Sequence, residues 1–339
     1  MKKIVLKDAW QVTIEDAPMP EMTEGHALLR VLYGGICGSD LSSYRGTMKY
    51  ITYPQTPGHE FSAEIVDVCD NDRGLKKGMH VTANPYFNCG KCYPCSKGLV
   101  NCCTTNQTMG IHRVGAFAEY IVLPIERIYD GKGLNPKTLA LVEPFCISHH
   151  GIKRANIKKG ESVLVVGAGA IGLLAAIAAL KNGGIVTICD VAQDKLAIAK
   201  NFGIQNILHN TGAEAFSARV DELTGGNGFD VVVEAVGLPT TFQNCIDAVC
   251  FGGRMVQLGV SKQNVDFFFT SIQQKELTVL GSRNARKEDF IEVIETLRSG
   301  NLNIDAVVTH MYKMAEAAKA FSDFDQKAGE VLKAMIDFS

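Results

Sequence analysis

The 339-residue sequence lacks an excess of charge of either sign, a low-complexity tract and an apolar stretch at its N-terminus. It has 34 Lys and Arg residues against 36 Asp and Glu residues, which leaves a net charge of −2. This balance argues against a protein that binds a polyanion by electrostatics, because such proteins usually show a clear basic excess. Without high net charge or a segment rich in Pro and Ser, long disordered regions are not expected either. Residues 1–8 carry charges and do not form the apolar run of a signal peptide.

Long hydrophobic runs are scarce too, and residues 162–180 stand out as an uncharged stretch that could pass for a membrane span. That stretch barely reaches the length that crosses a bilayer, and it contains Gly167, Gly169 and Gly172 close together. Such a glycine cluster favours a strand, a turn and a buried helix over one membrane helix. We therefore expect a soluble, cytoplasmic protein, with enough residues for about two domains.

Cysteine, by contrast, is plentiful: the sequence has 11, and five of them lie between residues 89 and 103. An odd number of cysteines in a long chain without a secretory signal does not indicate a disulfide framework. Such cysteines are reduced and buried as small apolar residues, or they bind metal.

The pattern of strands and helices changes at about residue 160. Before it, short strands are expected over residues 27–33, 64–68 and 119–123, among Gly, Pro and Asp. After it, strands alternate with helices, which predicts a parallel sheet built from βαβ units. The expected strands are 162–166, 185–189, 206–208, 229–234, 253–258 and 277–280, with helices over 170–181 and 193–202. Beyond residue 286 we expect helices over 289–298 and 314–325 and a closing strand over 330–336 that returns to the first domain.

A dinucleotide-binding motif follows the first strand of this alternating region. The strand over residues 163–166 leads into a GxGxxG sequence that opens an apolar helix. The first glycine permits the tight turn, the second lets the backbone approach a pyrophosphate, and the third allows close packing of helix on strand. Asp190 ends the next strand 18 residues after Gly172, near the spacing of a carboxylate that binds the ribose hydroxyls. That carboxylate repels a 2′-phosphate, so NAD is preferred over NADP; the alternative is a glycine-rich turn in an ordinary sheet.

Two groups of residues have the character of metal ligands. Four cysteines in a C-x2-C-x2-C-x7-C arrangement predict a closed structural zinc site, and they are Cys89, Cys92, Cys95 and Cys103. We take the neighbouring Cys102 as a bystander. Cys37 and the pair His59-Glu60 offer a thiolate, an imidazole and a carboxylate, which suit a catalytic zinc with an open position. Spacing alone does not join Cys37 to His59, and ordinary packing of both side chains is an equal alternative.

Taken together and in their order along the chain, these motifs resemble the zinc-dependent medium-chain alcohol dehydrogenases over nearly the full length. The motifs that carry the resemblance are Cys37-Gly-Ser-Asp, Gly58-His59-Glu60, the 89–103 lobe, Gly115-Ala-Phe-Ala-Glu119-Tyr120, Glu143-Pro144 and the GxGxxG sequence. The Glu143-Pro144 pair and the later Gly281-Ser-Arg-Asn are most similar to the polyol and sugar-acid branch. The implied fold is α/β: a GroES-like β-rich catalytic domain over residues 1–146 and 285–339, and a Rossmann doubly wound parallel-sheet domain over residues 147–284.

The resemblance also implies roles for individual residues. The catalytic zinc ligands would be Cys37 and His59, with Glu60 and Glu143 beside the metal, directly or through water. Ser39 would accept the proton of the substrate hydroxyl, Arg283 would contact an acidic substrate, and the carbinol carbon would give its hydride to the nicotinamide. The implied cofactor-binding residues are Gly167, Gly169, Ala170, Ile171, Gly172, Asp190, Lys195, Val236 and Val260.

Two positions depart from the family pattern, and several functions stay open. Ala63 stands where the His-Glu-x-x-Gly motif has glycine, and Ser42 stands where many relatives have a His that passes the proton to solvent. The expected function is NAD- and zinc-dependent oxidation of a secondary hydroxyl in a polyol or sugar acid, by a homodimer or homotetramer. L-Threonine 3-dehydrogenase or a butanediol-type dehydrogenase is the alternative within this family, and a zinc-free reductase is a further one. A nucleotide-sensing zinc module that binds nucleic acid is the alternative of another class, and the near-zero net charge argues against it.

Overall fold

The structure is a computed structural model that describes residues 1–299 and 302–339. The expected catalytic-domain segment 285–339 is therefore described apart from residues 300 and 301, which lie outside the described residues. The chain divides into two compact units. Unit 1 comprises Met1–Glu143 and Ala285–Ser339, and unit 2 comprises Pro144–Asn284.

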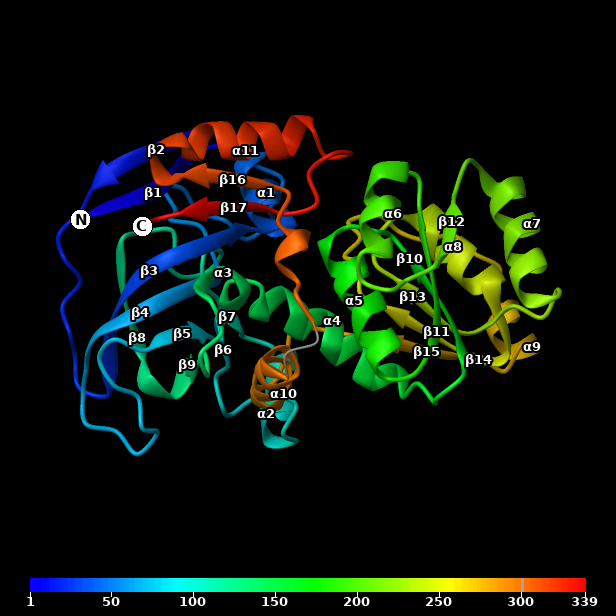
Figure 1. The fold of residues 1–339 in the computed structure, drawn as a ribbon, viewed down its shortest axis with the longest axis horizontal. Helices are drawn as coiled ribbons and strands as arrows, with labels where there is room; N and C mark the ends of the chain where they lie inside the picture. Colours follow the sequence, from blue (N-terminus) through cyan, green and yellow to red (C-terminus); the bar gives the residue numbers. More distant parts are fainter. Residues whose placement is uncertain (300–301) are drawn as a thin grey trace. The chain divides into compact units, whose positions relative to one another are not determined.

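Unit 1 is built on a seven-stranded sheet in the order β16-β17-β3-β4-β5-β9, with β8 paired to β3 (Figure 1). Two small antiparallel pairs, β1-β2 and β6-β7, accompany it. The strands are β1 (Lys2–Asp8), β2 (Gln11–Asp16), β3 (His26–Ile36), β4 (Glu60–Val68), β5 (His80–Ala83), β6 (Tyr86–Phe87), β7 (Gln107–Thr108), β8 (Tyr120–Pro124), β9 (Ile128–Asp130), β16 (His310–Lys313) and β17 (Ala334–Asp337). The helices are α1 (Gly38–Tyr44), α2 (Tyr93–Ser96), α3 (Pro136–Leu139), α10 (Lys287–Arg298) and α11 (Ala317–Gln326), and α4 (Val142–Ala155) begins here and continues into unit 2.

The core of unit 1 follows from alternation along its central strands. Successive side chains of a strand point to opposite faces, so every second residue can enter the core. Leu29 and Val31 of β3 are buried in this way, and they belong to the same apolar cluster as Phe61 and Ile65 of β4. The sheet thereby gives β3 and β4 a fixed register.

That register brings two distant segments of sequence to one place. β3 and β4 run antiparallel, and Gly35 near the end of β3 pairs with Glu60 at the start of β4. Cys37 directly follows β3 and His59 directly precedes β4. The two residues that the spacing along the chain could not connect therefore lie side by side.

The closing strand returns to the same sheet but is shorter than its sequence predicts. β17 pairs antiparallel with β3, and its Ala334 lies opposite Ile36. The expectation of a strand from residue 330 is wrong, because β17 begins at residue 334. The backbone N–H groups of Val331 and Leu332 donate instead to the carbonyl of Lys327 and the hydroxyl of Thr309, so they are not available to a strand.

Unit 2 contains one six-stranded sheet in the order β12-β11-β10-β13-β14-β15, and every neighbouring pair is parallel. This order is that of a doubly wound nucleotide-binding sheet, which confirms the predicted Rossmann fold. The elements are β10 (Ser162–Val166), α5 (Ala170–Lys181), β11 (Ile185–Asp190), α6 (Gln193–Lys200), β12 (Asn206–His209), α7 (Ala213–Thr224), β13 (Phe229–Glu234), α8 (Pro239–Ala248), β14 (Val249–Gln257), α9 (Thr270–Gln274) and β15 (Thr278–Gly281).

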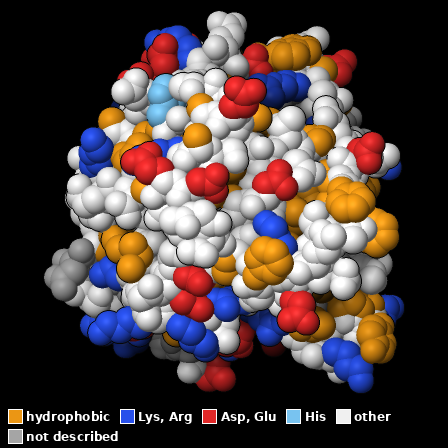
Figure 2. Space-filling view, turned by 90° about the vertical axis from the view of Figure 1, so that its right-hand side faces the viewer, with side chains coloured by type: hydrophobic (Ala, Val, Ile, Leu, Met, Phe, Trp, Pro, Cys, Tyr) orange, Lys and Arg blue, Asp and Glu red, His pale blue; other side chains and the backbone are white. Residues whose placement is uncertain are grey.

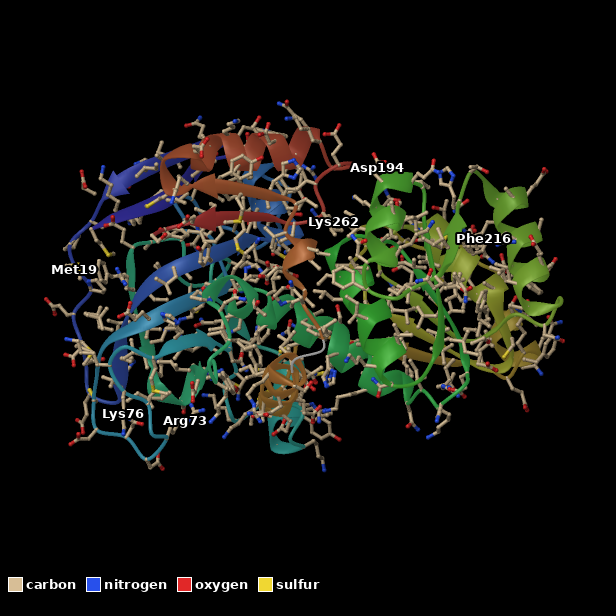
Figure 3. All side chains as sticks on the ribbon, viewed as in Figure 1. Met19, Arg73, Lys76, Asp194, Phe216 and Lys262 are labelled. Carbon is tan, nitrogen blue, oxygen red and sulfur yellow. The ribbon has the colours of Figure 1, made fainter. Side chains whose placement is uncertain are left out.

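Helices cover both faces of this sheet, with α5 and α6 on one side and α7 and α8 on the other (Figure 1). α7 was not expected from the sequence. Its Phe216, labelled in Figure 3, and its Val220 are buried and pack in the apolar core of unit 2. Gly225 ends α7 in the left-handed conformation, with a φ of 60°, which glycine adopts without steric cost.

Within the described residues, no helix is long and apolar enough to cross a membrane. The uncharged run over residues 162–180 forms β10, the glycine turn and most of α5. On the face of unit 2 in Figure 2, acidic and basic side chains lie interspersed.

Candidate active site

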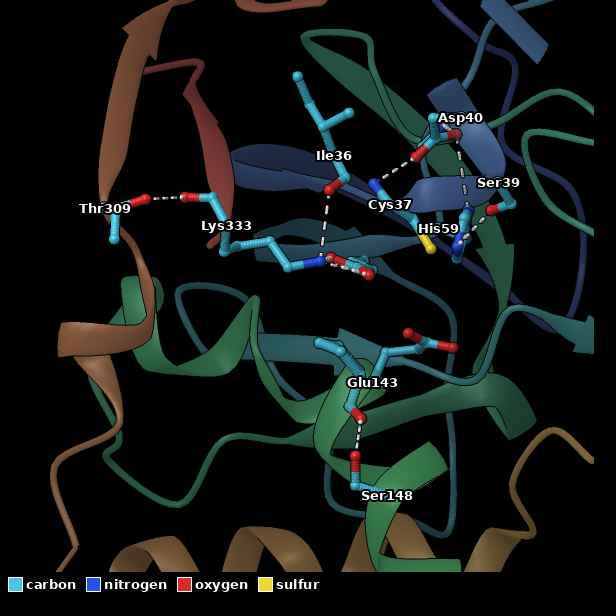
Figure 4. Close-up of polar contacts among 12 residues, drawn as sticks. Ile36, Cys37, Ser39, Asp40, His59, Glu143, Ser148, Thr309 and Lys333 are labelled. Atoms are coloured by element: carbon cyan, nitrogen blue, oxygen red, sulfur yellow. Dashed lines mark hydrogen bonds and ion pairs between the residues drawn. The ribbon is translucent and has the colours of Figure 1, made fainter. Parts of the chain in front are cut away.

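Three side chains with metal-binding atoms converge at the ends of β3 and β4. The ligand atoms of Cys37, His59 and Glu60 all lie within 4.8 Å of one another. His59 is 5% exposed and Glu60 is 0% exposed, so the group lies inside unit 1. Figure 4 shows the side chains of Cys37 and His59 turned toward one another.

Asp40 forms hydrogen bonds to both segments that carry the metal-binding side chains. Its carboxylate accepts the backbone N–H of Cys37 at 2.9 Å and that of Gly58 at 3.3 Å. One oxygen lies 3.8 Å from Nδ1 of His59. A carboxylate behind a histidine is the usual way to orient an imidazole that binds metal through its other nitrogen.

Electrostatics in this buried group favour a protonated His59 while no metal ion is present. Burial by itself opposes a charged imidazole, but the charges of Asp40 and Cys37 together raise the pKa of His59 well above its ordinary value. Burial raises the pKa of Asp40, and the charge of His59 opposes that shift. Asp40 therefore stabilises the protonated form of His59.

Ser39 lies on the other side of His59. Its hydroxyl Oγ is 3.4 Å from Nε2 of His59, and the residue stands in the first turn of α1. The helix begins directly after Cys37, so one short segment carries a thiol, a hydroxyl and the carboxylate of Asp40 to the same site.

Glu143 is near this group but not within it. Its carboxylate does not belong to the set of atoms that lie within 4.8 Å of one another, and it accepts a short hydrogen bond from the hydroxyl of Tyr86. Burial raises the pKa of Glu143 to about 7, and the charge of Glu60 adds to the shift while that of His59 opposes it. Glu143 is therefore a buried carboxyl group that can hold or release a proton near neutral pH.

Lys333 places a buried ammonium group beside Glu60. Its Nζ lies 2.8 Å from Oε1 and 2.6 Å from Oε2 of Glu60, and 3.3 Å from the carbonyl of Ile36. Burial opposes the charge of this lysine, yet the charge of Glu60 raises its pKa. Lys333 was not among the expected site residues, because nothing in a Leu-Lys-Ala segment 273 residues away from Glu60 points to the metal site.

The donor set of this group fits a zinc ion. Thiolate, imidazole and carboxylate are all zinc ligands, and three protein donors leave a position open. Nδ1 of His59 faces the carboxylate of Asp40 at 3.8 Å, which leaves Nε2, beside the hydroxyl of Ser39, for a metal ion. The arrangement is that of a catalytic rather than a closed site.

The four cysteines of the 89–103 lobe form a separate group. Their sulfur atoms lie within 4.8 Å of one another, and the set contains Cys103 but not Cys102. The sulfurs of Cys92 and Cys103 are 3.8 Å apart, and sulfurs bound at about 2.3 Å to a tetrahedral ion are separated by about that distance. Backbone N–H groups donate to the sulfurs of Cys89 and Cys103 at 3.3 Å, and hydrogen bonds lower the pKa of Cys89 to about 6. This group fits a structural zinc ion.

The glycine turn of unit 2 has the form that a dinucleotide needs. Gly167 has a φ of 106°, and a Cβ on Gly172 would lie 1.8 Å from the carbonyl oxygen of Gly167. Gly169 is the N-cap directly before α5, and a Cβ there would meet nothing within 4 Å. The missing side chain thus leaves open space in front of the N-terminus of α5, which is where a pyrophosphate binds in this fold.

Asp190 is the last residue of β11, at the carboxyl end of the sheet. One oxygen accepts the backbone N–H of Ala168 at 2.6 Å, and the other accepts that of Ala192 at 2.8 Å. The carboxylate is thereby fixed against the glycine turn. Lys195 stands on α6 and is half-buried, and Arg283 is exposed after β15.

A buried carboxylate forms hydrogen bonds to the segment that faces the glycine turn. Glu234, 0% exposed at the end of β13, accepts the N–H groups of Val236 at 3.0 Å and Gly237 at 2.8 Å, the hydroxyl of Thr241 and the amide of Gln257. A Cβ on Gly167 would lie 2.7 Å from the side chain of Val236, and one on Gly237 would lie 2.6 Å from the carbonyl oxygen of Val260. The glycine turn and the segments of Val236 and Val260 are therefore neighbours. Glu234 was not among the expected site residues; its place as the last residue of a largely apolar strand is the signal that could have found it.

These features define a class of protein: a metal-binding dehydrogenase with a nucleotide-binding sheet and a group of one thiol, one imidazole and one carboxylate. Residues 23–132 match the alcohol dehydrogenase GroES-like domain, and residues 170–299 match the zinc-binding dehydrogenase domain. The chain belongs to the family of zinc-dependent medium-chain alcohol dehydrogenases, and it is an oxidoreductase of a small-molecule substrate.

The similarity to known members extends over the whole chain. L-Galactonate-5-dehydrogenase of Escherichia coli K12 is 33% identical over 339 residues, which are 100% of this chain and 99% of that protein. Sorbitol dehydrogenase of Halalkalibacterium halodurans is 34% identical over 95% of this chain and 94% of that protein. L-Threonine 3-dehydrogenase of Pyrococcus abyssi is 32% identical over 91% of this chain and 90% of that protein. A short chain alcohol dehydrogenase of E. coli CFT073, solved with NADH, superimposes with a TM-score of 0.90 at 29% identity, over 100% of this chain and 99% of that one.

Proposed function

We propose that this protein oxidises a secondary hydroxyl group of a polyol or sugar acid and transfers the hydride to NAD+. The observation that carries the proposal is the group of Cys37, His59 and Glu60, whose ligand atoms lie within 4.8 Å of one another, with the hydroxyl of Ser39 at 3.4 Å from His59. The full-length similarity to a sugar-acid dehydrogenase and a sorbitol dehydrogenase supports this substrate class.

In this proposal the side chains of unit 1 bind the metal and move the proton. A bound zinc ion supplies Lewis acidity, which lowers the pKa of a neighbouring hydroxyl group. Cys37 and His59 hold the ion, and Glu60 and Glu143 stand beside it. Ser39 accepts the proton of the substrate hydroxyl and passes its own proton outward, and Glu143, whose pKa is about 7, is a second group that can take the proton up.

The residues of unit 2 bind the cofactor, whose nicotinamide accepts the hydride. Gly169 leaves room for the pyrophosphate at the start of α5, beside Ala170 and Ile171, whereas Gly167 and Gly172 keep the turn tight and close to the helix. Asp190 binds the ribose hydroxyls and favours NAD over NADP. The other proposed contacts are those of Lys195, Val236 and Val260 with the cofactor and of Arg283 with an acidic substrate.

The test is NADH formation with a panel of polyols, aldonates, a simple secondary alcohol and L-threonine. Turnover of a polyol or aldonate is expected, and it is lost on chelation of the metal and restored by added zinc. The variant Cys37→Ser serves as the matched control that removes one ligand. Turnover that survives both chelation and this substitution contradicts a metal-dependent reaction. Silence across the panel, in a protein that binds zinc and NAD, sends the search to phosphorylated sugars.

Oxidation of L-threonine is the second candidate, because a threonine dehydrogenase matches 91% of the chain at 32% identity. The same panel separates the two, since the amino acid carries an ammonium group that a polyol lacks. NADH formation confined to L-threonine would replace the polyol proposal.

The same proposal includes a homodimer or homotetramer in the cytoplasm. β15 lies at the edge of the six-stranded sheet, and its Val279 is 39% exposed. An open edge strand with an apolar side chain is a surface on which a second copy can pair. Analytical ultracentrifugation tests the oligomer, and a monomer across micromolar concentrations contradicts it. None of the 11 cysteines, all of which the structure describes, forms a disulfide bond, which suits a reducing compartment.

A further inference from the structure

Tyr86 is a buried phenol that the proposed reaction does not use. It is 7% exposed and lies in β6, where it is the register partner of Thr108 in β7. Its backbone N–H donates to the side chain of Asn84 at 2.9 Å, and its carbonyl oxygen accepts a hydrogen bond from the guanidinium group of Arg127. The backbone of Tyr86 is therefore fixed on both sides, and its side chain extends from a fixed point.

Arg127 is itself held by the residues that follow Tyr86. Its guanidinium group lies over the ring of Phe87, 4.6 Å from the centroid, and donates to the side chain of Asn88 at 3.3 Å. A planar guanidinium group is pre-organised, so it loses little freedom for each hydrogen bond that it forms. Three consecutive residues, 86 to 88, are thus bound by one cation.

The hydroxyl of Tyr86 donates to Oε1 of Glu143. Glu143 is 2% exposed and stands in the first turn of α4. Its carboxylate is turned toward Cys37 and His59 (Figure 4), yet it is not part of the set of ligand atoms that lie within 4.8 Å of one another. The structure therefore places a buried carboxylate beside the metal site, with a phenol bound to it.

Among the described residues, the hydroxyl of Tyr86 is the sole hydrogen-bond donor to the carboxylate of Glu143, and no cation forms an ion pair with it. Glu60, in contrast, is paired with Lys333. A hydrogen bond to an ionised carboxylate is roughly twice as strong as one between neutral groups, and the backbone of Glu143 belongs to a helix. One hydroxyl group is therefore in a position to fix this carboxylate.

A metal ion at Cys37 and His59 attracts Glu143, because carboxylate oxygens are zinc ligands. We infer that Tyr86 is a positioning residue, which holds the carboxylate of Glu143 outside the coordination sphere of that ion. This inference rests on the proposed metal site. Its consequence is an open position on the ion for the substrate hydroxyl, since a further protein ligand would close the site.

The experiment uses the full-length protein loaded with Co2+, whose d–d absorption reports the number of ligands. The difference between the spectra of the wild type and of Cys37→Ser isolates the proposed catalytic site from the four-cysteine site. If that difference is absent, the proposed metal site is wrong and the inference falls with it. If it is present, the results for Glu143 and Tyr86 decide the inference alone.

Glu143→Gln gives the first decision. Its cobalt spectrum should equal that of the wild type, because a carboxylate outside the coordination sphere is not missed by the ion. A spectrum that changes as it would on loss of a ligand shows that Glu143 coordinates the metal, and the inference is then wrong while the metal site stands.

Tyr86→Phe removes the hydroxyl group and keeps the ring. The d–d bands of this site should lose intensity, because Glu143 becomes a ligand and the coordination number rises. Release of the ion to a chelator should slow by about tenfold, within the range by which partners of metal ligands alter affinity. An unchanged spectrum, or a faster release in a folded protein, would overturn the inference. Tyr312→Phe is the matched control, since Tyr312 is 6% exposed and donates to Asp323 at 2.9 Å in the same unit.

Because a buried Glu143 without its donor could prevent folding, the double variant Tyr86→Phe/Glu143→Gln gives a further decision. If Tyr86 acts through Glu143, the double variant shows the wild-type cobalt spectrum, since no carboxylate remains to be released. A spectrum that still differs from the wild type means that Tyr86 acts on the metal site by another route, and the inference is wrong.

Discussion

The two compact units use buried charge in opposite ways. Unit 1 gathers charged side chains from distant segments around one point, where Asp40, His59, Glu60, Glu143 and Lys333 are all at most 5% exposed. Unit 2 buries Glu234 and satisfies it mainly with backbone N–H groups and neutral side chains. In unit 1 the buried charges place reactive side chains at one point, whereas in unit 2 the buried carboxylate fixes the backbone of the loops beside the glycine turn. The difference suits a metal ion and a proton in one unit and a dinucleotide in the other.

The largest expected effect separates the two units functionally. Cys37→Ser removes a metal ligand from unit 1, and kcat/KM should fall by at least about 10³-fold, because metal Lewis acidity is worth several kcal/mol. The dissociation constant of NADH, measured by fluorescence titration, should stay unchanged. Cys69→Ser, a half-buried cysteine of the same unit, should keep full activity. A loss of NADH binding in Cys37→Ser would contradict the assignment of metal binding to unit 1 and cofactor binding to unit 2.

The next effect is on the stability of unit 1 without metal. The folded-state pKa of Glu143 is about 7, above the ordinary 4.5, so the folded state holds this proton more tightly than the unfolded state. The associated stability is present below pH 4.5 and is lost as the pH rises through 7, by up to about 3 kcal/mol.

Chemical denaturation of the metal-free protein between pH 4 and pH 8 measures this loss. In Glu143→Gln the dependence should flatten over that interval, whereas Glu126→Gln, which changes an exposed carboxylate, should keep the wild-type slope. Equal slopes in all three proteins would argue that Glu143 does not titrate in this range.

Two glycines of unit 2 offer a sharper contrast within one turn. A Cβ on Gly172 collides with backbone at 1.8 Å, whereas a Cβ on Gly169 meets nothing within 4 Å. Gly172→Ala should therefore lower the free energy of unfolding by about 1–3 kcal/mol. Gly169→Ala should leave thermal unfolding unchanged and weaken NADH binding, because its methyl group occupies the space left for the pyrophosphate. If both variants lose only stability, the open space at Gly169 does not serve the cofactor.

The smallest expected effect concerns the segments of Val236 and Val260, which lie beside the glycine turn and are held by Glu234. The hydroxyl of Thr241 donates to Glu234 at 2.6 Å, and Thr241→Val removes that donor. A single hydrogen bond of this kind contributes about 0.5–1.5 kcal/mol, so the NADH dissociation constant should rise by up to about tenfold. Thr240→Val, on the exposed side of α8, is the control and should bind NADH as the wild type does.

The Rossmann sheet was the part of the fold easiest to predict from the sequence. The predicted bounds of β10, α5 and β13 agree with the structure residue for residue, because their apolar runs are continuous and are bounded by Gly and charged residues. β14 is longer than expected: it starts at Val249 rather than residue 253, since Gly252 and Gly253 resemble a turn in the sequence but continue the strand.

β4 shows why the metal site was harder to predict from the sequence than the Rossmann sheet. The sequence predicts this strand from residue 64, whereas it begins at Glu60. A carboxylate at a strand start argues against burial unless a partner is known, and the partner of Glu60 is Lys333, 273 residues away. Tyr86, which binds Glu143, was missed for the same reason.

By itself, the sequence determined the family, the parallel sheet with its glycine turn, and the four-cysteine group, because each depends on residues that lie close together along the chain. Only the tertiary structure decided that Cys37 and His59 meet, through the register of β3 and β4. It also decided that Asp40 braces both segments and that Lys333 engages both oxygens of Glu60. Contacts between residues far apart in sequence depend on strand pairing and packing, which local patterns do not encode.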